Sequence, residues 1–176
     1  MINPAYNESW QQAKDVLEEQ GFVLLAQILD KETRDELLKQ LQEASYEEEH
    51  QPALHRYDTT LVPQKVHDIL EAISEKLGIP APSRTQQRRY KKGSYTLQDD
   101  DEPKSGYDYT LLLSEQWNTN WRGEITYAHP QQEALRVPPQ ENALLVVKRE
   151  ADTTRFTKRV NHHASNEYYA THATTR

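Results

Sequence analysis

Residues 88–117 read RRYKKGSYTLQDDDEPKSGYDYTLLLSEQW, and this stretch decides the fold class of the chain. Its residues begin to alternate with a period of two: Tyr95 and Leu97 share one predicted face, and the small polar residues beside them share the other. Alternation of that kind is typical of a β-strand, because successive side chains of a strand point to opposite faces. The sequence therefore predicts that β structure begins here.

Five more strand candidates follow at short intervals: Tyr109 to Leu113, Glu124 to Tyr127, Ala143 to Val147, Phe156 to Val160, and Tyr168 to Thr171. Short strands at such spacing indicate a barrel or jelly roll. We expect two facing antiparallel sheets, because each strand has an apolar phase that must be buried. The expected core side chains are Leu97, Leu111, Leu113, Ile125, Leu145, Val147, Phe156 and Val160.

The half of the chain before this stretch has helical periodicity. Three helices are predicted from their apolar spacing and from local start and stop signals: Trp10 to Gly21, Asp30 to Ala44, and Pro63 to Gly78. A short strand from Phe22 to Leu25 and an exposed loop from Glu47 to Gln51 are expected between them. The third helix has the clearest apolar stripe, made of Val66, Ile69, Leu70, Ile73 and Leu77.

Helices first and strands afterwards predict an α+β domain whose helices pack on one sheet. The length suits a single domain over residues 1–176. Residues 1–80 would be a mostly helical buttress with one early strand, and residues 81–176 would form the β core.

Composition narrows the classes of function. The chain has no cysteine, which excludes disulfides and thiolate sites and fits a reducing compartment. We expect a soluble cytoplasmic protein, because no apolar run is long enough for a membrane span and the first residues lack signal-peptide features. The net charge of -7 disfavours nucleic acid as a partner, although one local cluster is basic: Arg84, Arg88, Arg89, Lys91 and Lys92.

The order of segments in the β half resembles the iron(II)- and 2-oxoglutarate-dependent dioxygenases of the prolyl hydroxylase kind. In that family a Tyr-x-x-Gly strand precedes a His-x-Asp pair, a strand ending in tryptophan, a Gly-Gly-Glu-Leu turn and a Pro-x-x-Asn segment. The matching residues are Tyr90, Gly93, Trp117, Gly123, Glu124, Pro139 and Asn142. Residues 21–41 also resemble the opening strand and helix of the family. The resemblance implies a double-stranded β-helix, a cupin-like jelly roll, with the N-terminal helices on one sheet.

The resemblance also identifies the positions of a metal site. The family binds iron(II) with two histidines and one carboxylate, which leave coordination positions open for 2-oxoglutarate and oxygen. Those ligand positions fall on Asp99, Asp101 and Arg155. Asp101 keeps the carboxylate, but both histidines are replaced. An arginine cannot bind iron, because its guanidinium stays protonated.

The positions that contact 2-oxoglutarate in the family are changed as well. The basic residue that holds the far carboxylate falls near Glu167 or Tyr168, and a tyrosine that touches the same carboxylate falls on Leu111. The resemblance therefore implies a pseudoenzyme that uses neither iron nor 2-oxoglutarate. Such a domain would have a binding or regulatory role and hold a peptide, a protein or a small anion at the mouth of the barrel.

An active oxygenase with a non-standard site is the alternative. It would bind iron(II) and 2-oxoglutarate through Asp99, Asp101 and one of His162 and His163, of which at most one can face the pocket because neighbouring strand residues point opposite ways. The run Asp99 to Asp101 also fits a hard cation such as calcium or magnesium, or a solvated loop.

Arg155 has two interpretations. If it points into the barrel, its natural partners are Asp99 and Asp101, and an internal ion pair would replace the metal. If it turns outward, it is an ordinary residue of a strand edge. The sequence leaves both orientations open.

Overall fold

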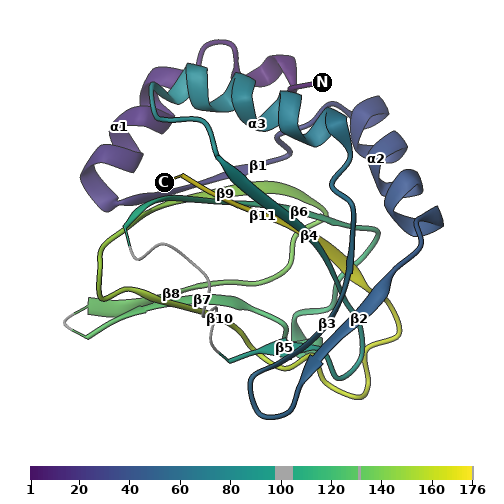
Figure 1. Cartoon of the computed structure of the whole chain (residues 1–176). Coiled ribbons are helices and arrows are strands. Elements are labelled where there is room, and N and C mark those ends of the chain that lie inside the picture. The colour runs from purple at the N-terminus through teal and green to yellow at the C-terminus, as the bar shows by residue number, and fades with distance from the viewer. Residues whose placement is uncertain (98–104, 131, 176) are drawn as a thin grey trace.

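The structure is a computed structural model that describes residues 1–97, 105–130 and 132–175. Three α-helices cover one side of a curled sheet (Figure 1): α1 (Trp10–Gln20), α2 (Lys31–Glu43) and α3 (Gln64–Leu77). Two short 3-10 helices occur at Pro4–Tyr6 and Thr119–Trp121. None of the helices in the described residues combines the length and apolarity needed to cross a membrane.

The strands pair only antiparallel in the described part of the chain, as expected for a jelly roll. They are β1 (Phe22–Ala26), β2 (Glu47–Gln51), β3 (His55–Thr60), β4 (Arg84–Tyr90), β5 (Tyr95–Thr96), β6 (Gly106–Ser114), β7 (Ile125–His129), β8 (Gln132–Val137), β9 (Asn142–Arg149), β10 (Thr154–Thr157) and β11 (Tyr168–Thr174).

The strand order produces two facing layers. The order is β1-β9-β6-β11-β4-β3-β5-β10-β7-β8, and β2 pairs with β3. Figure 1 shows an upper layer beneath the helices, which contains β1, β9, β6, β11 and β4. The lower layer lies opposite it and contains β5, β10, β7 and β8. β3 joins the layers, because it pairs with β4 on one side and β5 on the other. The chain is thus an α+β jelly roll with helices on one sheet.

Local signals set the helix ends as predicted. The carboxylate of Asp30 accepts a hydrogen bond from the backbone N–H of Thr33 at 2.8 Å, which caps α2. Gly21 and Gly78 end α1 and α3 with φ angles of 75° and 69°. This left-handed conformation favours glycine, since a Cβ atom would be strained there.

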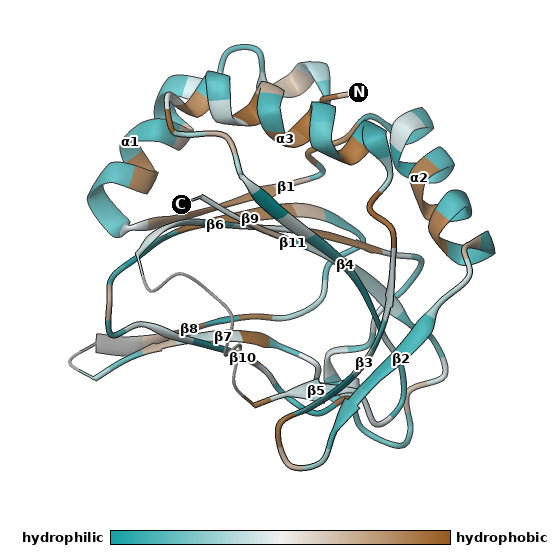
Figure 2. Cartoon of the chain, viewed as in Figure 1, coloured by the Kyte–Doolittle hydropathy of each residue, from teal (hydrophilic) through white to brown (hydrophobic). Residues whose placement is uncertain are grey.

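Two hydrophobic cores lie on opposite faces of the upper layer. The helix-side core joins the stripe of α3 to every second residue of β6, including Tyr109, Leu111 and Leu113. Figure 2 shows hydrophobic residues on the side of α3 that faces the sheet. The barrel core lies between the layers and contains residues from both, including Leu112 and Ile125. The helices therefore stabilise the sheet from outside and do not enter the barrel.

The predicted apolar phase is wrong in the two strands β5 and β10. Leu97 is 54% exposed and Phe156 is only half-buried, whereas Thr96, Arg155 and Thr157 are buried. β10 begins two residues earlier than expected, and its pairing with β7 turns Arg155 into the barrel. Phe156 must then point outward, because neighbouring strand residues face opposite ways.

The first half of the chain contains three strands instead of the one predicted for residues 1–80. Glu47 to Gln51, expected as a loop, forms β2, although all five residues are exposed as predicted. β3, which the sequence analysis missed, is rich in polar residues. Both strands form because β3 finds backbone partners in β4 and β5, a tertiary condition that apolar periodicity does not report.

Candidate functional site

A charged cluster lies inside the barrel, between the two layers. The carboxylate Oδ2 of Asp108 on β6 accepts hydrogen bonds from Nη1 of Arg155 at 3.0 Å and from Nη1 of Arg149 at 3.3 Å. Asp108 is 2% exposed and Arg155 is 1% exposed. Asp108 belongs to the upper layer and Arg155 to the lower, so this ion pair connects the layers across the interior. Of the two orientations left open for Arg155, the structure has the inward one.

Strand alternation places these side chains. Along β6, Tyr109 and Leu111 belong to the helix-side core, whereas Leu112 belongs to the barrel core. Asp108 shares the phase of Leu112 and therefore faces the barrel. Arg155 faces Tyr127 of β7 in the strand pairing, and Tyr127 is also in the barrel core.

Further donors surround the buried carboxylate. Tyr127 donates its hydroxyl hydrogen to Oδ2 of Asp108 at 3.2 Å. Burial raises the pKa of the Tyr127 phenol, and the Asp108 carboxylate raises it further, so the phenol stays protonated. Arg149 is also held by the carbonyl oxygen of Thr153, 2.9 Å from its Nη2. A buried carboxylate needs such partners to offset its lost hydration.

An aromatic group packs in the barrel core. The rings of Tyr90 and Tyr168 stack with centroids 4.9 Å apart, and Trp117 meets Tyr168 edge-on at 4.9 Å. The Tyr168 hydroxyl donates to the carbonyl oxygen of Gly123 at 2.9 Å. A Cβ atom on Gly123 would lie 3.1 Å from Tyr168 and 3.1 Å from Val160. Tyr90, Trp117 and Gly123 carry the sequence resemblance, and here they form one packed scaffold.

Asn142, another residue of the resemblance, also has a scaffold role. Its side-chain amide donates to the carbonyl oxygen of Leu29 at 2.8 Å, and its carbonyl accepts from the backbone N–H of Leu29 at 3.1 Å. These two hydrogen bonds connect the start of β9 to the segment before α2. They satisfy both the donor and the acceptor of a buried side-chain amide.

The positions assigned to 2-oxoglutarate contacts do not converge in the structure. Tyr168 lies in the barrel core, whereas Leu111 packs against the helices, so its predicted place at the cosubstrate is wrong. The inward residue at this point of β6 is Leu112. Glu167 is partly exposed, and its carboxylate lies 3.7 Å from Arg89.

Two of the four residues of the alternative metal site, His162 and His163, lie in the described part of the chain. His162 and His163 are exposed in a turn after β10, with ring centroids 3.8 Å apart. That one of them binds a metal together with Asp99 and Asp101 stays a prediction. Asp99 and Asp101 lie outside the described residues, together with Asp100. The predicted pairing of Arg155 with Asp99 or Asp101 falls there too, and the described partner of Arg155 is Asp108.

One group in the described residues has three potential metal ligands close together. Nε2 of His129 lies 2.8 Å from Oδ1 of Asp152 and 3.4 Å from Oε2 of Glu150. The three ligand atoms lie within 4.8 Å of one another. Both carboxylates are exposed, and exposed acidic residues around a histidine are common without a metal. This group was not predicted from the sequence.

Solved structures with the same architecture identify the fold. A Pseudomonas putida prolyl-4-hydroxylase matches with a TM-score of 0.75 and 11% identity, over 95% of this chain and 99% of its own. A Burkholderia pseudomallei protein of the 2OG-Fe(II) oxygenase family matches with a TM-score of 0.71 and 14% identity, over 99% and 93%. The chain has the double-stranded β-helix fold of the 2-oxoglutarate- and iron(II)-dependent oxygenases. The oxygenase fold predicted from the order of motifs is confirmed.

Two further comparisons bear on this oxygenase fold. A Trichoplax adhaerens prolyl hydroxylase, solved in complex with a peptide fragment of the hypoxia inducible factor oxygen degradation domain, has a TM-score of 0.73 and 13% identity, over 94% of this chain and 88% of its own. Prolyl 3-hydroxylase OGFOD1 of Mus musculus is 36% identical over 80 residues, which span 43% of this chain but only 14% of that protein. No protein-family model matches the chain.

Iron(II) does not fit the described part of the barrel interior. Its central carboxylate, on Asp108, is engaged by two guanidinium groups and a phenol. A buried histidine, His172, is present on β11, with Nδ1 3.2 Å from Oγ1 of Thr110. The residue that the sequence resemblance assigns to the distal ligand, Arg155, is a buried cation, which would repel a metal ion and offers it no lone pair.

The roles of Asp108 and Arg149 were not predicted from the sequence, although a signal existed. Asp108 interrupts the apolar stretch YDYTLLL, and Arg149 ends the run ALLVVKR. A charged residue in the buried phase of a strand is rare unless it is paired, so each predicts a partner inside the barrel. The identity of that partner required the three-dimensional structure.

Proposed function

We propose that the chain is a noncatalytic binding or regulatory domain built on the oxygenase fold. The buried ion pair between Asp108 and Arg155 carries this proposal. It spans the two layers, and Arg155 stands at the position of the distal metal ligand in the sequence resemblance. The pair would take over the structural role of iron by holding the same strands together.

The surroundings of Tyr168 support the absence of 2-oxoglutarate. The resemblance places the family's basic side chain for the far carboxylate near Glu167 or Tyr168, and of these two Tyr168 lies in the barrel core. Burial raises the pKa of the Tyr168 phenol well above its ordinary value, so the side chain is neutral. Its hydroxyl hydrogen is donated to Gly123. A neutral, already bonded phenol provides no charge to hold a dicarboxylate.

We propose a peptide as the ligand at the barrel mouth. A protein or a small anion is the other kind of ligand that this site could hold. The Trichoplax adhaerens enzyme was solved with a peptide fragment bound, and that supports a peptide for a chain with the same fold. Fold alone does not transfer a ligand, so the chemistry of the surface must specify it.

An active oxygenase with a non-standard metal site is the second candidate. The cluster of His129, Glu150 and Asp152 favours it, because one nitrogen and two carboxylate oxygens can bind a divalent ion. Such a site would use different residues from those of the family triad. It would still need a group to hold 2-oxoglutarate.

We expect the purified protein to form no succinate from 2-oxoglutarate when iron(II), ascorbate and oxygen are supplied. The reason is that Asp99 and Arg155 stand where the resemblance has the family's two histidines, and that neither Glu167 nor Tyr168 is basic. Succinate is measured by mass spectrometry, and binding of iron(II) is measured in parallel by anaerobic calorimetry. An active prolyl hydroxylase assayed in the same buffer is the positive control.

Succinate release that depends on iron would contradict the proposal and favour the oxygenase. Two variants would then locate the metal: loss of activity in His129→Ala would assign it to the cluster at the end of β7. Loss in Asp101→Ala would assign it to the position that keeps the family carboxylate.

A further inference from the structure

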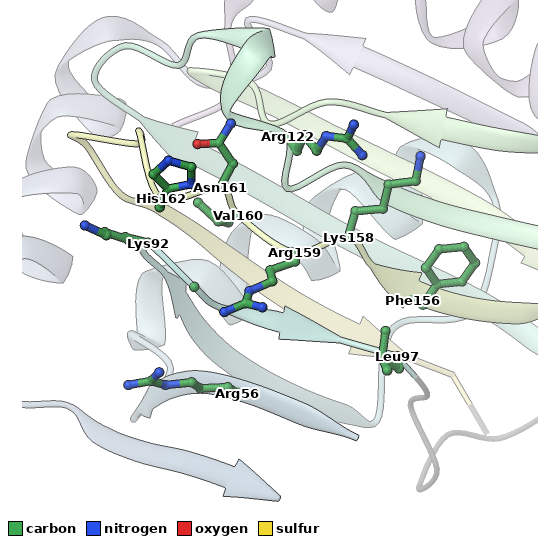
Figure 3. Close-up of a pocket in the computed structure, with 11 residues that line it drawn as sticks. Arg56, Lys92, Leu97, Arg122, Phe156, Lys158, Arg159, Val160, Asn161 and His162 are labelled. Atoms are coloured by element: carbon green, nitrogen blue, oxygen red, sulfur yellow. The ribbon is translucent and has the colours of Figure 1, made fainter. Parts of the chain in front are cut away.

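A basic cavity of about 660 Å³ lies on the outer side of the lower layer. Phe156 lines it and points away from the barrel, since the buried Arg155 and Thr157 occupy the opposite phase of β10. The other walls come from β3, from the residues on either side of β5, from Arg122 after the second 3-10 helix, and from the segment after β10, which contributes Lys158 to His162. Figure 3 shows these side chains. The cavity is therefore separate from the ion pair inside the barrel.

Positive charge is concentrated in this cavity in a chain whose net charge is -7. Among the described lining residues five are basic and none is acidic, the basic ones being Arg56, Lys92, Arg122, Lys158 and Arg159. Arg56 has a partner, with its Nε 2.8 Å from Oε1 of Glu48. The other four make no ion pair with any carboxylate of the described residues. Unpaired cations around a hollow attract a negatively charged ligand.

The cavity also has an apolar end. Leu97 is 54% exposed, and Phe156 and Leu97 lie close together at one end of the view in Figure 3. Arg122 and Lys158 lie on one side of the cavity, and Arg56 and Lys92 lie on the other. A ligand would therefore meet cations on two sides and an apolar surface at one end.

A second cavity extends the first into a groove. It has a volume of about 340 Å³ and shares Arg56, Gly93, Leu97 and Arg159 with the larger one. It adds His50 and Tyr95 to the lining. The combined groove suits an elongated ligand better than a compact ion such as phosphate.

We propose that this groove binds an acidic peptide segment that contains an apolar side chain. Carboxylates would pair with the cations on the two sides, and the apolar side chain would cover Leu97 and Phe156. The inference rests on the proposed function in taking a peptide as ligand, but it specifies the chemistry of that peptide and places it in the outer groove instead of at the barrel mouth. Single-stranded nucleic acid fits less well, because such grooves stack successive bases on several aromatic rings. Phe156 is the one phenyl, phenol or indole ring in the described lining of the larger cavity.

The test uses a short fluorescein-labelled peptide in which glutamates flank one central leucine. We expect its fluorescence anisotropy to rise to saturation with added protein and the affinity to fall as salt is added. The same peptide with glutamine in place of glutamate should bind at least about tenfold more weakly, because the charge pairs are lost. Serine in place of the leucine should weaken binding less.

Two variants assign the binding to the groove. Lys92→Glu combined with Arg159→Glu should weaken binding at least about tenfold, since attraction becomes repulsion at two exposed side chains. Leu97→Ala should weaken binding of the leucine peptide but not of the serine peptide. Lys39→Glu on α2 is the matched control, because its side chain is 74% exposed and distant in the fold, and it should leave the affinity unchanged.

The proposal is overturned if the glutamate and glutamine peptides bind alike, or if the groove variants bind as the wild type does. If oligothymidylate binds more tightly than the acidic peptide, the ligand of the groove is single-stranded nucleic acid and the peptide proposal is wrong. The assay contains neither iron nor 2-oxoglutarate, so its result is independent of turnover. If succinate forms and the peptide also binds, only the noncatalytic role is contradicted. If neither occurs, only the proposal that the groove binds a peptide is contradicted.

Discussion

Arg155→Met is expected to lower the free energy of unfolding by about 3 to 5 kcal/mol, because it leaves the buried Asp108 carboxylate with one charged partner fewer. The side chain of Arg155 is fully buried, and that of Asp108 nearly so, so water cannot replace the lost contact. Methionine matches the aliphatic part of the arginine side chain and keeps the packing of that part. Urea unfolding followed by circular dichroism measures the change.

A double-mutant cycle with Asp108→Asn isolates the pair itself. The double variant should cost less than the sum of the two single variants, by more than about 0.5 kcal/mol, because the second change removes the charge that the first left unpaired. Arg149 and Tyr127 also contact Asp108, so Asp108→Asn alone should be destabilising as well. Additive effects would show that the ion pair contributes nothing of its own.

Arg56→Met is the matched control for this cycle. Arg56 also pairs with a carboxylate, that of Glu48, but both side chains are more than two-fifths exposed. Water screens an exposed pair, so this variant should have a urea midpoint close to that of the wild type. An equal loss at Arg56 and Arg155 would mean that burial does not set the strength of the pair across the barrel.

Ile73→Ala is expected to cost about 2 to 5 kcal/mol, because it leaves a cavity between α3 and the upper layer. Ile73 is fully buried in the helix-side core. The neighbouring Ser74 holds α3 at its distance from β6, because its hydroxyl donates a hydrogen bond to the Tyr109 hydroxyl at 3.0 Å. The helix cannot easily move inward to fill the space. Ile69→Ala should behave in the same way, and both are measured by urea unfolding.

Glu71→Ala provides the control on the same helix. Glu71 is exposed, and alanine is a good helix former, so the change should stay within about 0.5 kcal/mol of the wild type. An unchanged urea midpoint for Ile73→Ala would contradict the packing of α3 on the sheet. A loss for Glu71→Ala as large as that for Ile73→Ala would show that helix propensity, and not burial, governs this segment.

The sequence by itself predicted those features whose causes are local. Gly21, Asp30 and Gly78 end or begin helices through their own backbone or side-chain chemistry, and the structure has those ends. The long apolar strands β6 and β9 were also predicted, because apolar runs of that length must be buried wherever they lie. The order of these segments sufficed to predict the fold.

Only the tertiary structure decided which way the short strands face and which charges meet. β5 and β10 are too short for their residue pattern to decide which side chains face the barrel. Their pairing with β3 and β7 decides it, so that Arg155 is buried and Leu97 is exposed. β6 and β10 lie on opposite layers, and the contact of Asp108 with Arg155 exists only because the sheet curls. The basic groove has the same origin, since its cations come from segments that the curled sheet brings together. Local patterns report burial along one strand, whereas contacts across a barrel depend on the register and closure of all its strands.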